Sequence, residues 1–156
     1  MYNYGEFGNC TVNVYNSILW NNKDISSTET INANISNNSA LIILTHSLVE
    51  GSGGSGSGWI GGSYWDGLEN IDEDPLFVTP VNPGDAPTSA GNLRLQEGSP
   101  AIDKGDNDFV TYVSTDLDGN PRIVDGNLDG TPTVDMGAYE YQIPYIYDIN
   151  LPLVSR

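Results

Sequence analysis

Positive charge is scarce in this sequence. Five Lys and Arg residues stand against 21 Asp and Glu residues, which gives a net charge of −16 over 156 residues. Proteins that bind nucleic acids or anionic membranes without regard to sequence do so through Lys and Arg. The composition therefore excludes both classes of partner, and it makes divalent cations the natural counter-ions of the surface.

Other residue types are also scarce, and their scarcity limits the folds that the chain can adopt. The single cysteine, Cys10, cannot form an internal disulfide. No apolar run approaches the ~20 residues of a membrane-spanning helix. The chain has three phenylalanines and two methionines but 18 glycines and nine prolines. That composition favours short strands joined by turns over helices.

A phrase of the strand–turn–strand type occurs twice. NSIL at 16–19 returns about thirty residues later as HSLV at 46–49, and residues 28–35 between them alternate apolar and polar side chains. Such a repeat indicates stacked coils, with strands ~4.8 Å apart and asparagines at the bends. His46 has no second histidine to accompany it, so we expect a residue of the coil wall and not a transition-metal ligand.

A Gly/Ser-rich segment follows the second phrase at 51–67. It is too poor in apolar side chains to form a core of its own, yet it carries three aromatic residues. Exposed aromatic rings stack on sugars, which predicts a contact with cell-surface glycans; alternatively the loop folds back over the flank of the coils. The residues concerned are Trp59, Tyr64 and Trp65.

Aspartates concentrate between 91 and 141, among glycine turns. Residues 125–130 (DGNLDG) match the first half of a calcium loop of the EF-hand kind, but Met136 occupies the position of the closing ligand. Residues 116–120 form a second half-motif. Either the two half-loops share one calcium ion or they make hairpin turns without metal. The predicted calcium ligands are Asp116, Asp118, Asn120, Asp125, Asn127, Asp129 and Asp135.

Four phrases carry a resemblance to a known family. They are NIDEDPLFV at 70–78, LRLQEGSPAIDKG at 93–105, TDLDGNPRI at 115–123 and VDMGAYEY at 134–141. In this order they resemble the C-terminal end of bacterial secreted right-handed parallel β-helix proteins, where the block usually precedes a surface-anchoring tail. The resemblance implies an extracellular or cell-surface location. Since the N-terminus lacks the pattern of a secretory signal, we expect a processed chain or a piece of a longer solenoid.

The predicted fold is therefore all-β. It is a right-handed parallel β-helix of few coils at 1–102, a loop-rich Asp/Gly cap at 103–144, and a C-terminal strand or tail at 145–156. An open solenoid end exposes unpaired backbone groups, and the apolar tail is suited to pair with such an edge on a second copy. We expect a homo-oligomer or filament, with self-assembly through Ile146, Ile149, Leu151 and Leu153.

Two functions of different classes fit this fold. The first is a non-catalytic structural or adhesive protein, self-assembling and stabilised by calcium. The alternative is a carbohydrate-binding or polysaccharide-degrading domain, since β-helices host pectate lyases and polygalacturonases. The Asn-Thr-Asp and Gly-His-Gly motifs of the hydrolases are absent, and the PRIV context of Arg122 lacks their lysine. We expect Arg122 to pair with a neighbouring aspartate and the protein not to be an enzyme.

Overall fold

The computed structural model describes residues 2–4, 11–23, 34–38, 41–60, 65–85 and 87–144, with the backbone alone for 2–4 and 36–38. Within these ranges the regular elements are short strands and single turns of 3-10 helix. The strands before residue 70 are β1 (Tyr2–Tyr4), β2 (Thr11–Tyr15), β3 (Ile18–Leu19), β4 (Ser36–Asn38), β5 (Leu41–Thr45), β6 (Leu48–Val49) and β7 (Trp65–Asp66). The later ones are β8 (Phe77–Thr79), β9 (Asn92–Leu95), β10 (Ile123–Val124) and β11 (Thr133–Val134), and the turns are η1 (Gly56–Gly58), η2 (Pro83–Asp85) and η3 (Asn107–Val110).

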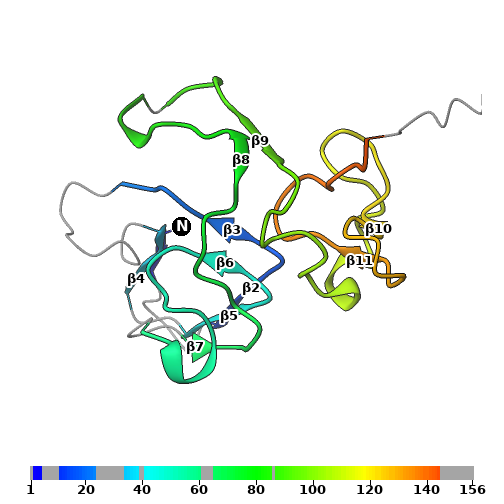
Figure 1. Cartoon of the computed structure of the whole chain (residues 1–156). Coiled ribbons are helices and arrows are strands. Elements are labelled where there is room, and N and C mark those ends of the chain that lie inside the picture. Colours follow the sequence, from blue (N-terminus) through cyan, green and yellow to red (C-terminus); the bar gives the residue numbers. More distant parts are fainter. Residues whose placement is uncertain are drawn as a thin grey trace, which may run out of the picture.

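The first seven strands pair in parallel. β5 lies between β2 and β7, β3 pairs with β6, and β1 pairs with β4. Thr11 faces Leu41 and Ile18 faces Leu48, so the register follows the spacing of the repeated phrase. We call these strands the parallel stack; Figure 1 shows it in blue to green, with the later segments in yellow to orange at its side.

The expected right-handed parallel β-helix is nevertheless wrong for the described part of the chain. There the strands form five small separate sheets, and β8–β9 and β10–β11 are antiparallel, so no closed solenoid is present. The parallel order ends after β7. Pro80 and Pro83 follow β8 and have no N–H to donate to a ladder, so the chain turns back into β9.

The bends of the stack repeat as the strands do. Asn16 and His46 occupy equivalent positions with φ of 47° and 46°, a left-handed conformation that asparagine tolerates well. His46 thus lies at a bend and not in a wall. The next residue in each phrase is a serine whose hydroxyl donates to the carbonyl two residues earlier, at 2.7 Å for Ser17 and 3.0 Å for Ser47. In the next turn of the stack, the Asn70 side chain accepts a hydrogen bond from the Ser47 amide at 3.1 Å.

Two apolar clusters share β6. Val49 belongs to a cluster inside the stack with Val14, Ile35, Ile42 and Leu44. Leu48, on the opposite face, belongs to a second cluster with Leu95, Ala101, Ile102 and Met136. Successive side chains of a strand point to opposite faces, so one two-residue strand contributes to both clusters. β6 is therefore the wall that joins the stack to the C-terminal segments.

Candidate functional site

The aspartate-rich segment 99–141, called the cap from here on, contacts the bend at Asn16. The Asn16 side chain donates to Asp106 O at 2.9 Å and accepts from the Asp106 amide at 2.8 Å, and Asn16 O accepts from Gly137 N at 2.8 Å. A Cβ on Gly105 would lie 2.7 Å from a Val134 methyl. Glycine is required there because the cap backbone approaches this closely.

Asp135 lies at the centre of the cap and is 1% exposed. Its two carboxylate oxygens accept hydrogen bonds from the amides of Asp103 (2.8 Å) and Tyr141 (2.6 Å). The Asp103 carboxylate in turn accepts from the amides of Gly126 (3.2 Å) and Asn127 (2.7 Å). Buried polar groups must find partners, so these two aspartates replace strand ladders as the means of satisfying the cap's backbone.

A buried contact between an arginine and a glutamate lies beside Asp135. Arg122 Nη1 is 3.0 Å from Glu140 Oε1, with the Arg122 and Glu140 side chains 8% and 1% exposed. The same guanidinium donates to Gly137 O at 3.0 Å, and Glu140 Oε2 accepts from the Asp135 amide at 3.1 Å. The expectation of an aspartate partner for Arg122 is thus wrong, because the chain reversal at 137–140 places Glu140 against the guanidinium.

Asp116 is the hub of the loop at 116–120. Its carboxylate accepts from the amides of Asp118 (2.9 Å), Asn120 (2.8 Å) and Glu140 (3.0 Å), and from Asn120 Nδ2 at 3.3 Å. The neighbouring Asp118 turns outward and forms a bidentate pair with Arg94. Arg94 also lies over the Tyr139 ring, 4.5 Å from its centroid.

The loop at 125–130 is closed by its own side chains. Asp125 accepts from the amides of Asp129 and Gly130, both at 3.0 Å, and Asn127 Oδ1 accepts from the Asp129 amide at 2.8 Å. Asp129 accepts from Thr131 N at 2.8 Å. These bonds close the loop as a local turn.

The seven predicted calcium ligands therefore divide among several groups. Asp116 and Asn120 share one loop, Asp118 pairs with Arg94, Asp125, Asn127 and Asp129 share a second loop, and Asp135 is buried. Within the described ranges, no three His, Cys, Asp or Glu side chains gather as metal ligands would. Calcium binding stays a prediction.

Burial and backbone amides shift the acids of the cap in opposite directions. Burial, reinforced by the charge of Asp135, raises the pKa of Glu140 to about 8. Burial also raises the pKa of Asp135 to about 6, although two backbone amides bind its ionised form. Burial acts on Asp116 too, but the amides of Glu140 and Asn120 outweigh it and lower its pKa below the usual value. The cap thus holds two weak acids beside a strong one.

Asp103, Arg122 and Glu140 are members of this network that sequence reasoning did not assign to a site. The only sequence signal was their place in the phrases AIDKG, NPRI and GAYEY.

The predicted aromatic contact residues do not form one platform. Trp59 is partly buried and packs on the inner cluster of the stack, whereas Trp65 in β7 is 65% exposed. Tyr64 lies outside the described residues, as do the predicted assembly residues Ile146, Ile149, Leu151 and Leu153. The position of Trp59 fits the alternative in which the loop folds back over the coils. Glycan contact through this loop stays a prediction.

In comparison with known proteins, no family model, no curated protein and no solved structure matches the chain. The resemblance to secreted β-helix proteins therefore stays a prediction drawn from the four phrases alone. No helix in the described ranges is both long and apolar enough to cross a membrane.

Proposed function

We propose that this chain is a non-catalytic structural or adhesive module of an extracellular or cell-surface protein, and that it associates with further copies by strand addition. The observation that carries this proposal is the free edge of the parallel stack. In the described part of the chain, β2 and β3 are both terminal strands of their sheets. An unpaired strand edge is a template for another chain.

The backbone of β3 shows what this edge offers. Ser17 O accepts from Leu48 N at 2.8 Å and Leu19 O accepts from Glu50 N at 3.0 Å, so both carbonyls face β6. Peptide groups alternate along a strand, which directs the Ile18 N–H and C=O to the opposite edge. No described strand pairs there. The tail at 145–156 is apolar and strand-like in sequence, and it is the segment we assign as the partner, contributed by a second copy.

The use of the buried acids supports a structural role. Asp103, Asp116 and Asp135 each accept at least two backbone amide hydrogens. A general acid or base needs a carboxylate that can reach a substrate proton, and these carboxylates are engaged in holding the cap together.

Sedimentation velocity over a range of concentrations tests the proposal. We expect the full chain to sediment as oligomers that grow with concentration, and deletion of residues 145–156 to yield monomers. Asn13→Lys, at an exposed position of β2, should also yield monomers, since a charged side chain on an edge strand opposes pairing. The matched control is Thr79→Lys at an exposed position of β8.

A monomeric full chain at high concentration would contradict the proposal. Unchanged association after deletion of the tail, or equal effects of Asn13→Lys and Thr79→Lys, would contradict the assigned edge and partner.

A further inference from the structure

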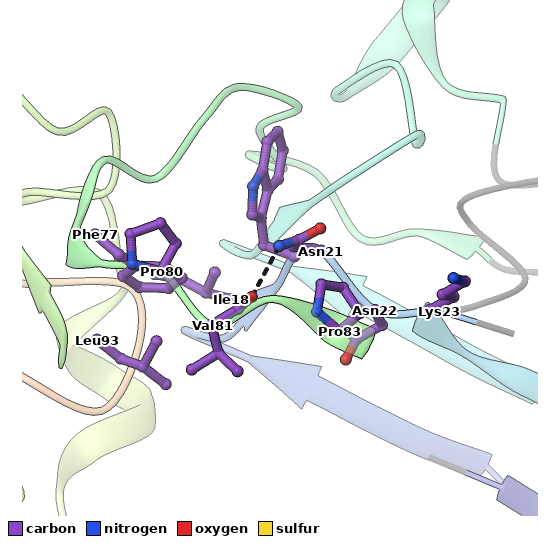
Figure 2. Close-up of a pocket in the computed structure, with 10 residues that line it drawn as sticks. Ile18, Asn21, Asn22, Lys23, Phe77, Pro80, Val81, Pro83 and Leu93 are labelled. Atoms are coloured by element: carbon purple, nitrogen blue, oxygen red, sulfur yellow. Dashed lines mark hydrogen bonds between the residues drawn. The ribbon is translucent and has the colours of Figure 1, made fainter. Parts of the chain in front are cut away.

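A pocket of about 430 Å³ lies beside the end of β3, where the chain passes from Trp20 to Lys23. Its other lining residues come from β8, from the segment that follows β8 and from β9. Figure 2 shows Phe77 and Pro80 on one side and Lys23 on the other, with the hydrogen bond between Asn21 and Val81 in the middle. The size is that of pockets for small organic ligands, roughly 300–1,000 Å³.

The apolar part of this pocket consists largely of rings. Trp20 and Phe77 are half-buried aromatic residues, and Pro80 and Pro83 add two saturated rings. Flat apolar surfaces of this kind suit a ligand that is itself a ring with an apolar face. Trp20 also packs against the second apolar cluster, which holds its position relative to β3.

The polar side chains of the pocket are held by hydrogen bonds. Asn21 Nδ2 donates to Val81 O at 3.0 Å and Asn22 Nδ2 donates to Asn34 Oδ1 at 2.6 Å. Both amide groups are thereby oriented, and neither carbonyl oxygen accepts a hydrogen bond from a described residue. Lys23 forms no ion pair with any described residue. The pocket is thus lined by two side-chain amides whose orientation is fixed by hydrogen bonds and by one ammonium donor.

This combination selects a class of ligand. Two carbonyl oxygens require hydrogen-bond donors, which an anion does not have, and Glu50 Oε2 lies close by, 2.7 Å from Asn21 N. A proline-rich peptide fits the rings, but its prolines have no N–H for the two carbonyl oxygens. Hydroxyl groups both donate and accept. An uncharged polyhydroxylated ring meets all three requirements.

We propose that this pocket binds a neutral pyranose unit of an uncharged polysaccharide. The ring stacks between the Trp20 side and the proline side, its hydroxyls donate to the Asn21 and Asn22 carbonyl oxygens, and Lys23 donates to a hydroxyl or ring oxygen. The site is separate from the aromatic residues of the 51–67 loop. It does not depend on self-association, since no residue of a second copy is needed to complete it.

Affinity electrophoresis of the full chain in gels containing a soluble β-glucan, a mannan, a galactan or polygalacturonate tests this, with titration calorimetry for any polymer that retards migration. We expect retardation by at least one neutral polymer and none by polygalacturonate. Lys23→Ala and Trp20→Ala should each weaken binding about tenfold or more, which corresponds to the loss of one good contact. Lys104→Ala and Trp65→Ala, at exposed positions, are the matched controls and should bind as the parent does.

Melting temperatures show whether Trp20→Ala is folded, and Lys23→Ala, at an exposed position, gives the same test without disturbing a packed side chain. Failure of every neutral polymer to retard the chain would overturn the proposal. Retardation by polygalacturonate alone, binding of a proline-rich peptide in place of a glycan, or loss of binding in Trp65→Ala with none in Lys23→Ala would overturn it as well.

Discussion

The parallel stack and the cap are held together by different means. In the stack, five backbone-paired positions join β2 to β5, and the aliphatic side chains of Ile42 and Leu44 are fully buried between strands. In the cap, the two strands of β10–β11 have two residues each, and buried carboxylates accept the backbone amides that no ladder satisfies. The stack combines backbone ladders with buried aliphatic side chains, whereas the cap adds carboxylate–amide hydrogen bonds to its share of the second apolar cluster.

This difference makes the two regions sensitive to different conditions. Removal of apolar surface from water depends little on proton concentration, whereas the charge of a buried carboxyl and the strength of its hydrogen bonds both change when it binds a proton. Acid–base chemistry and metal ions should therefore act on the cap, and side-chain volume should act on the stack.

The largest expected effect is that of removing a cap carboxylate. Asp135→Ala leaves the amides of Asp103 and Tyr141 without acceptors and should lower the free energy of unfolding by about 3–5 kcal/mol. Leu44→Ala in the stack should cost about 2–5 kcal/mol through lost burial and a cavity. Urea unfolding followed by circular dichroism measures both. Asp108→Ala and Leu128→Ala, at exposed positions, are the controls and should change stability little; equal losses in a control and its partner would contradict the comparison.

A smaller effect is expected from pH. Folding raises the pKa of Glu140 from 4.5 to about 8 and that of Asp135 from 3.8 to about 6. Between these values the folded chain binds more protons than the unfolded chain, so stability falls as pH rises from about 4.5 to 8. We expect a loss on the order of a few kcal/mol across this window. Glu140→Gln should flatten the profile measured by thermal unfolding.

Glu97→Gln, at an exposed position, is the control for this profile and should leave it unchanged. A parent protein whose stability rises through the same window would show that Glu140 is ionised in the folded state and that Arg122 outweighs its burial.

The smallest effect concerns calcium. A cation that binds only the folded chain adds stability by mass action, about 2.7 kcal/mol at a hundredfold excess over Kd. We expect calcium to raise the melting temperature of the parent and a chelator to reverse the change. Asp125→Ala combined with Asp129→Ala should abolish the response, while Asp72→Ala with Asp74→Ala should retain it. A melting temperature that is insensitive to calcium would leave the loop at 125–130 as a turn alone.

Local sequence was sufficient for the parallel pairing of the stack. The spacing of NSIL and HSLV predicted the register of Ile18 with Leu48, because an in-register parallel ladder repeats both the apolar column and the left-handed bend at one interval. The asparagine bend was predictable for the same reason. The repeat did not indicate where the parallel pairing stops. After β7 the chain reverses into antiparallel pairs, and the solenoid expected from the family phrases does not close.

Tertiary structure decided how the acids of the cap are used. The half-motifs predicted where Asp116 and Asp125 make turns, since those hydrogen bonds are formed within a few residues. Nothing in the spacing indicated that Asp135 would bind Asp103 N, or that Arg122 would be buried against Glu140. The same applies to the pocket beside β3, which joins Trp20 to Pro80. Such contacts depend on how the β8–β9 pair and the cap pack against β6, and that packing is a property of the folded chain as a whole.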